Sequence, residues 1–202
     1  MTAATDQEWL LAALRTYRAA GFFADRSAMS DAELAELLQD EHEDEWAERL
    51  GPDPNVPVLA EVRVLAYDRV RTWWQDLEAD VAPGNDIYVR VLNEWAAISG
   101  GAFRPDRLAE RWATPDGPVT LDVEIGDRRW ELRATVREDW LDLGVLDGLN
   151  AVLAETRAPR RFVALLPGDQ TALVAALDAG EQNRIEHERG VRFAIHRGTP
   201  PS

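Results

Sequence analysis

The stretch from Val119 to Val136, VTLDVEIGDRRWELRATV, decides how the C-terminal half of this chain is expected to fold. On each side of Gly126-Asp127, apolar and polar residues alternate, which is typical of a β-hairpin with one buried face. The opposite face carries charged side chains, so it is the first place where the sequence indicates chemistry. The buried face is expected to consist of Val119, Leu121, Val123, Ile125, Trp130, Leu132, Ala134 and Val136.

The sequence leaves two registers open for this hairpin. A two-residue turn at Gly126-Asp127 pairs Asp122 with Glu131, whereas a four-residue loop pairs Asp122 with Arg133 and Glu124 with Glu131. Both registers keep the apolar face intact, so periodicity does not choose between them. In either register two carboxylates oppose each other, which destabilises the pair unless a cation or an arginine lies between them.

One interpretation of the charged face is a divalent-metal site. Asp122 and Glu131 would bind the ion and Arg133 would stabilise an anionic transition state, as in a metal-dependent hydrolase. Asp122 followed by Glu131-Leu132-Arg133 on a hairpin resembles the PD-(D/E)xK nuclease arrangement, which implies a nuclease-like activity. The chain departs from that pattern with Arg in place of Lys, no Pro before Asp122 and a short spacing. The plainer interpretation is a solvated face whose arginines neutralise its acids.

Capping boxes and turns divide the N-terminal half into predicted helices. Thr5 to Glu8 and Ser30 to Glu33 each have the Ser/Thr-x-x-Glu pattern, which predicts helices that run to residue 20 and to about residue 50. Apolar stripes predict a long helix over residues 58–79. Two shorter helices are expected over residues 86–98 and 106–112.

The C-terminal half is expected to alternate strands and helices. After the hairpin, the pattern predicts a helix over 139–155, strands over 162–166 and 169–177, a helix capped by Asp178 and ending at 189, and a strand over 191–196. The expected order is ββαββαβ. The sequence therefore predicts an α+β protein, with an α-helical region at 1–115 packed on a mainly antiparallel sheet at 116–202, as one compact domain or as two.

The charge balance indicates which partners to expect. The 202 residues carry a net charge of −15. Residues 1–100 hold 8 Arg against 20 Asp and Glu, a net charge of −12, whereas residues 101–202 hold 14 Arg against 17 acids, a net charge of −3. Such a surface repels phosphate groups, so neither nucleic acid nor an anionic membrane is an expected partner. It would steer a basic partner toward the N-terminal half.

Missing residue types exclude several chemistries. The chain has no Cys, and all of its 22 basic residues are Arg. Disulfides, thiolate metal sites and Schiff-base catalysis are therefore excluded. Serine occurs only at 27, 30, 99 and 202, so a serine hydrolase is not expected either. We expect no cofactor, and the absence of a secretory signal or a long apolar run predicts a cytoplasmic location.

Two features of the N-terminal half could contact a partner. In the run Asp40 to Glu45, His42 continues an apolar stripe with Leu34, Leu38 and Trp46, and Asp40, Glu43 and Asp44 point elsewhere. Glu41 and Glu45, or His42 and Glu45, could share a cation, but two ligands do not make a metal site. Adjacent Trp73 and Trp74 cannot face the same neighbour on a helix, so they are expected to pack against different elements unless one anchors a partner. The residues expected to steer a basic partner are Glu41, Glu43, Asp44 and Glu45.

These observations favour a non-catalytic, acidic, cytoplasmic protein that binds another protein. An inhibitor or immunity-type protein that masks a basic partner, such as a nuclease toxin, fits this size and charge. The alternative is the divalent-metal-dependent hydrolase with Asp122, Glu131 and Arg133. A third possibility is a scaffold that associates with itself as a homo-oligomer.

Overall fold

The computed structural model describes residues 3–46, 50–52, 56–168 and 170–194, without the side chains of 3–5 and 43–46. Its helices are α1 (Ala3–Ala19), α2 (Asp31–Trp46), α3 (Pro57–Leu65), α4 (Ile87–Ile98), α5 (Val145–Glu155) and α6 (Ala179–Arg189), with a 3-10 turn η1 at Ala24–Arg26. Its strands are β1 (Thr72–Asp76), β2 (Arg107–Trp112), β3 (Val119–Ile125), β4 (Arg128–Ala134), β5 (Arg161–Leu165) and β6 (Thr171–Leu177). The strands form two antiparallel sheets, ordered β1-β6-β5 and β2-β3-β4, so the predicted α+β class is confirmed.

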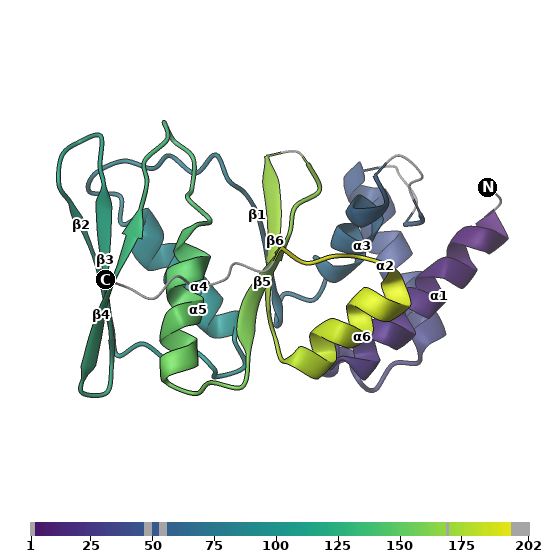
Figure 1. The fold of residues 1–202 in the computed structure, drawn as a ribbon. Helices are drawn as coiled ribbons and strands as arrows, with labels where there is room; N and C mark the ends of the chain where they lie inside the picture. Colours follow the sequence, from purple (N-terminus) through teal and green to yellow (C-terminus); the bar gives the residue numbers. More distant parts are fainter. Residues whose placement is uncertain (1–2, 47–49, 53–55, 169, 195–202) are drawn as a thin grey trace.

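The elements lie in four layers (Figure 1). Sheet β2-β3-β4 forms one end of the molecule, and α4 and α5 lie between it and sheet β1-β6-β5. Helices α1, α2, α3 and α6 cover the other face of sheet β1-β6-β5. This sheet therefore separates two apolar cores.

Strand β6 is the centre of this arrangement. Its successive side chains belong alternately to the core with α4 and α5 and to the core with α1, α2, α3 and α6. The side chains from Ala172 to Leu177 are all at most 2% exposed. The nearly continuous apolar sequence TALVAAL is what a strand covered on both faces requires. The strand predicted here is confirmed.

Of the two capping boxes predicted in the N-terminal half, the one at Ser30 is confirmed, whereas the one at Thr5 is wrong, because α1 already begins at Ala3. The Ser30 N–H donates to Glu33 Oε2 at 2.7 Å, and the Glu33 N–H donates to Ser30 Oγ at 3.2 Å, which is the predicted capping box. Asp178 and Glu181 form the same arrangement at the start of α6. The hairpin has the two-residue turn, with Asp122 opposite Glu131.

The predicted helix over residues 58–79 is wrong. Helix α3 ends at Leu65, and residues 72–76 form strand β1. The Asp68 carboxylate accepts hydrogen bonds from the backbone N–H groups of Phe23, Val70 and Arg71. The Thr72 hydroxyl donates to the carbonyl of Leu65 at 3.0 Å. These hydrogen bonds pair backbone groups of α3 and of the turn that follows it. Asp68 also accepts from Phe23, 45 positions away, and local periodicity gives no sign of such a contact.

The predicted helix over residues 106–112 is also wrong, because residues 107–112 form strand β2. Its inward face carries Leu108, Glu110 and Trp112, so a carboxylate stands where an apolar residue would mark a strand. Glu110 accepts hydrogen bonds from the Tyr88 N–H and the Trp112 indole, both at 3.0 Å, which compensates its burial. The acid interrupts the apolar alternation that would have identified the strand.

Several predicted boundaries also change. Helix α5 begins at Val145 and not at 139. Helix α2 is described to Trp46, and residues 47–49, which precede its predicted end near 50, lie outside the described residues. Of the predicted strand over 191–196, Ala194 forms one bridge with Ala164, and residues 195–196 lie outside the described part. The order ββαββαβ predicted for residues 116–202 is followed from β3 to α6, but the last strand is only one bridge among the described residues. The strands form two sheets instead of one, and the region predicted as α-helical, 1–115, contributes β1 and β2 to them. The boundary between 115 and 116 stays a prediction, and one core contains residues from both sides of it.

Candidate functional site

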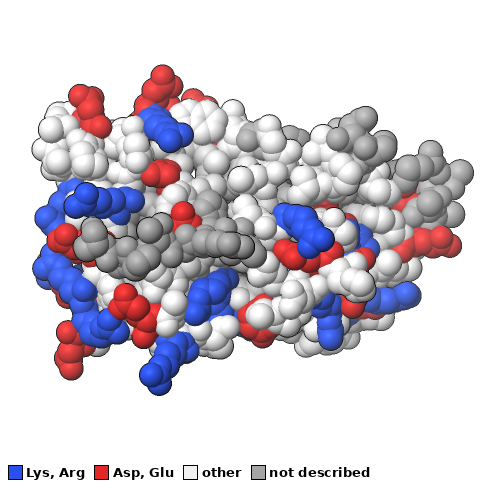
Figure 2. Space-filling model, in the orientation of Figure 1, with Lys and Arg blue, Asp and Glu red and all other residues white. Residues whose placement is uncertain are grey.

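The charged face of the hairpin lies at the end of the molecule where arginines gather in Figure 2. Arg111 of β2 donates from Nε and Nη2 to the two carboxylate oxygens of Asp122 at 2.8 and 2.9 Å, and Nη2 also donates to Glu131 at 2.8 Å. Arg129 places its Nη2 2.8 Å from Asp122 Oδ1. Arginines occupy the four corners of this face, whose cross-strand rows are Arg107, Glu124, Arg129; Ala109, Asp122, Glu131; and Arg111, Thr120, Arg133.

This network fixes the charge of the residues expected under the hydrolase alternative. Hydrogen bonds from Arg111 and then Arg129 lower the pKa of Asp122 to about 2, although burial of its side chain opposes the shift. Asp122 therefore stays ionised and is a weak proton acceptor near neutral pH. The structure brings Asp122 and Glu131 together around Arg111. Arg133 is exposed opposite Thr120 and has no ion pair among the described residues.

Within the described ranges, three or more Asp, Glu or His side chains are nowhere grouped so that they could hold a metal ion. On the hairpin face, the two opposed carboxylates share an arginine, which is the arrangement that removes their mutual repulsion. What the geometry provides there is a neutralised sheet surface.

The acidic helix α2 is described in part. Glu41 is half-buried, with Oε2 3.8 Å from Arg26 Nη1. The predicted steering residues Glu43, Asp44 and Glu45 lie where side chains are not described. The predicted stripe is confirmed for its described members: Leu34, Leu38 and His42 are buried. The exposed acids of the described part are Glu33, Glu36 and Asp40.

The adjacent tryptophans lie on strand β1 and face opposite sides of it, as alternation along a strand requires. Trp73 belongs to the core with α4, where its indole N–H donates to Glu94 Oε2 at 2.7 Å and its ring meets the Trp95 ring edge-on at 5.7 Å. Trp74 packs against the core with α3. The prediction that they contact different elements is confirmed.

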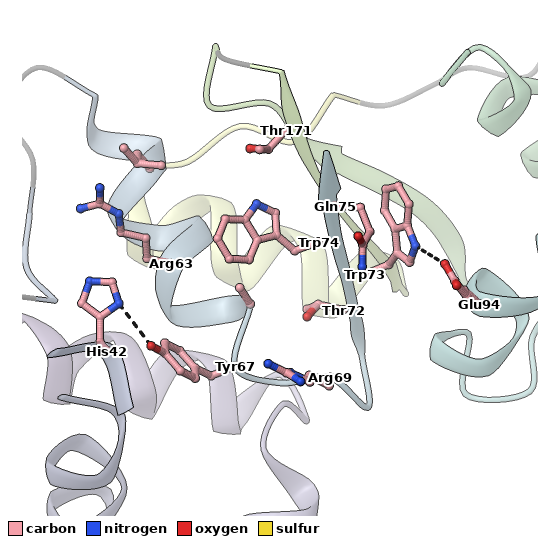
Figure 3. Close-up of a pocket in the computed structure, with 12 residues that line it drawn as sticks. His42, Arg63, Tyr67, Arg69, Thr72, Trp73, Trp74, Gln75, Glu94 and Thr171 are labelled. Carbon is pink, nitrogen blue, oxygen red and sulfur yellow. Dashed lines mark hydrogen bonds between the residues drawn. The ribbon is translucent and has the colours of Figure 1, made fainter. Parts of the chain in front are cut away.

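A cavity of about 490 Å³ opens beside β1 (Figure 3). In the figure, Trp74 lies in the middle of the cavity, with His42 and Arg63 on one side of it and Trp73 with Glu94 beyond β1 on the other. His42 Nδ1 lies 3.2 Å from the Tyr67 hydroxyl. The lining comes from α2, α3, the turn before β1, β1, α4 and the start of β6: His42, Leu59, Arg63, Ala66, Tyr67, Arg69, Thr72, Trp73, Trp74, Gln75, Glu94 and Thr171.

The lining is suited to binding. It combines aromatic surface with charges of both signs, because Arg63 and Arg69 line it together with Glu94, which lies across the strand from Trp74. The indole N–H of Trp74 is buried and has no hydrogen-bond partner among the described residues. Four consecutive residues of an edge strand, 72–75, line the cavity, so its wall includes backbone as well as side chains. Such a mixture recognises peptide better than a small apolar molecule.

The sequence identified only part of this cavity. Trp73 and Trp74 were singled out, and His42 was placed on the correct face of its helix. Tyr67, Arg69 and Glu94 were missed, because the wrong helix over 58–79 placed the first two on a regular spiral and nothing connected α4 to β1. A strand assignment at 72–76 is the signal that would have brought Glu94 opposite Trp73.

Comparisons with family models, with curated proteins and with solved structures returned no match for this chain. The helices of the described residues are too short or too polar to cross a membrane.

Proposed function

We propose that this protein binds another protein, a basic one, as an inhibitor or immunity-type protein that masks its partner. The observation that carries the proposal is that the acidic helix α2 lies beside the cavity at β1, with His42 of α2 in the cavity wall. A basic surface drawn to α2 would meet Trp74 within the same contact area. The proposed setting is the cytoplasm, as the sequence predicts.

The charge of α2 supports this proposal. Residues 31–46 hold eight Asp or Glu and no Arg or Lys. Five of these acids, from Asp40 to Glu45, fall in the C-terminal turns of the helix, where negative charge opposes the helix dipole. Each costs a few tenths of a kcal/mol, up to about 1 kcal/mol, of helix stability. A concentration of like charge that weakens its own helix is better explained by attraction of a partner than by folding.

Trp74 supplies the second part of the contact. Large aromatic side chains in partly buried pockets carry much of the binding free energy of protein interfaces. Trp74 is half-buried at the centre of the cavity. Trp73 is 6% exposed and bonded to Glu94, so it supports the wall of the site and is not itself the anchor.

Affinity capture from a native-host lysate tests the proposal. The wild-type protein is expected to retain a basic protein at low salt and release it at high salt, because exposed charges are screened. The variant Glu36→Lys/Asp40→Lys changes two exposed acids of α2 and should lose most of that protein. The control Asp116→Lys/Glu138→Lys makes the same charge change in exposed loops outside α2 and should retain it. Equal retention by both variants would contradict the proposal.

The hydrolase alternative has no comparable observation in its favour. Asp122 and Glu131 already accept hydrogen bonds from Arg111, and Arg133, in the adjacent cross-strand row, forms no ion pair with either. Self-association remains a third proposal, and sedimentation of the purified protein over a range of concentrations tests it.

A further inference from the structure

Strand β1 is an edge strand with one side open. Its sheet has the order β1-β6-β5, so only one side of β1 is paired. In an antiparallel pair, residues whose N–H and C=O groups face the partner alternate with residues whose groups face away. The Leu77 N–H donates to the Gln170 carbonyl at 2.8 Å, which continues the register of Trp73 with Val174 and of Gln75 with Ala172.

That alternation gives the direction of the remaining backbone groups. Thr72, Trp74 and Asp76 have their N–H and C=O groups on the side away from β6. The Thr72 N–H is used within the turn before the strand, since it donates to the Asp68 carbonyl at 2.9 Å. Among the described residues, the backbone groups of Trp74 and Asp76 have no partner on this open side.

Nothing in the sequence of β1 blocks the open side. Proteins usually protect an exposed edge with Pro, Lys, a bulge or a very short strand. The sequence TWWQD has neither Pro nor Lys, and the pairing with β6 runs without a bulge over all five residues. The cavity lies along this open edge, since Thr72, Trp73, Trp74 and Gln75 all line it.

We infer that the open edge of β1 takes an extended segment of the partner protein as a fourth strand, next to β1 in the order added strand, β1, β6, β5. This inference rests on the proposed function and specifies how the partner is held. The backbone of the segment bonds to the N–H and C=O of Trp74 and to the N–H of Asp76, which is the recognition mode of strand addition. Only an extended polypeptide offers donors and acceptors at that spacing.

The side chains beside the edge define the segment. A residue opposite Trp74 points to the same face as Trp74, where Leu59, Ala66 and Tyr67 line the cavity, so it is apolar. The next residue points to the face of Trp73 and Glu94. Glu94 is exposed and accepts a hydrogen bond from the neutral Trp73 indole, and no ion pair joins it to an arginine among the described residues, so its carboxylate can pair with a basic side chain. The segment therefore alternates apolar and basic residues, in agreement with a basic partner.

Phage-displayed linear peptides of seven residues, selected on the full-length protein, test the inference. Enriched peptides are expected to alternate apolar and basic residues. They should bind the Asp76→Ala variant about fivefold more tightly than the Asp76→Pro variant, because proline removes one hydrogen bond. Both variants lose the same carboxylate, and only proline lacks the outward N–H. Equal affinity for the two variants, or no enriched peptide, overturns the inference.

A second measurement on the wild-type chain is independent of any variant. Hydrogen exchange at the Trp74 amide should slow at least tenfold when a selected peptide is bound, and unchanged exchange overturns the inference. The two proposals fail separately. Strand addition alone would be contradicted if a basic partner is captured through Glu36 and Asp40 but binds Asp76→Pro as tightly as Asp76→Ala. The masking function alone would be contradicted if peptides bind at the edge but no basic protein is captured from the lysate.

Discussion

Arg111 of β2 holds Asp122 of β3 through two parallel hydrogen bonds of 2.8 and 2.9 Å, and the same guanidinium reaches Glu131 of β4. The one residue that neutralises both hairpin carboxylates thus comes from a strand that the sequence predicted as a helix. Opposed acids, which on the hairpin alone indicated a metal site, are part of a three-stranded salt-bridge network in the folded protein.

Replacing Arg111 should destabilise the folded state at neutral pH more than at acid pH. The pKa of Asp122, about 2, lies below its ordinary value of 3.8, so its ion pairs stabilise the folded state fully above about pH 5. This contribution is lost as the pH falls from about 4 to 2. Arg111→Ala should therefore lower the free energy of unfolding at pH 7, by an amount that solvent screening keeps small, and by much less at pH 2. Urea denaturation at both pH values measures this. Arg133→Ala, which breaks no ion pair among the described residues, should change it by less than about 0.5 kcal/mol.

Divalent ions should leave the melting temperature unchanged. A bound ion would stabilise the folded state once its concentration exceeds its Kd, but Arg111 already occupies the position between Asp122 and Glu131 where an ion would lie. Titration with Mg²⁺ and Mn²⁺ up to millimolar concentration, followed by thermal melting, checks this. A rise in melting temperature that Glu131→Ala abolishes would favour the hydrolase alternative over the binding proposal.

The sequence predicted those elements whose signals are local. Capping at Ser30 and Asp178 and the alternation of β3 and β4 depend on residues a few positions apart, and all of these were confirmed. Strand β2 was missed because its inward face includes Glu110, whose burial is compensated by Tyr88 from another element. An acid whose burial depends on a tertiary contact looks, in sequence, like an exposed residue.

Strand β1 was missed for a related reason. Adjacent Trp73 and Trp74 hide the two-residue period, because both faces of this strand are apolar where two cores meet. The helical spacing of Trp73 and Leu77 then extends the pattern of α3 past its true end. The candidate site depended on this strand, so the sequence located the tryptophans without the open edge on which they lie.

The two tryptophans should respond differently to loss of their indole N–H. Trp73→Phe removes the hydrogen bond to Glu94, whereas Trp74→Phe removes a buried N–H that has no partner among the described residues. Both changes lose similar apolar volume, so the difference isolates the hydrogen bond. Trp73→Phe is expected to be less stable than Trp74→Phe by about 1 kcal/mol. Guanidinium denaturation compares them, and an equal loss would contradict the assigned bonding.

Breaking the buried ion pair between Glu61 and Arg189 should lower the free energy of unfolding more than breaking an ion pair on the surface. Arg189 Nη2 lies 2.8 Å from Glu61 Oε1, and the two side chains are 8% and 5% exposed. Arg189→Met leaves a buried carboxylate beside the Tyr17 hydroxyl and should cost about 3–5 kcal/mol. The double variant Glu61→Met/Arg189→Met removes both charges and should recover most of that loss. Thermal melting of the two variants measures this, and a double variant weaker than Arg189→Met would refute it.

The direction of the backbone groups along β1 can be tested by stability alone. Gln75 faces Ala172 and should bond to β6, so Gln75→Pro removes a ladder hydrogen bond and is expected to cost about 3 kcal/mol. The Asp76 N–H faces away from β6, so Asp76→Pro should cost no more stability than Asp76→Ala. Both variants lose the hydrogen bonds that the Asp76 carboxylate accepts from Glu78 and Gln170. Urea denaturation of the three variants gives the comparison. If Asp76→Pro were as damaging as Gln75→Pro, the open edge would not present the N–H that a fourth strand needs.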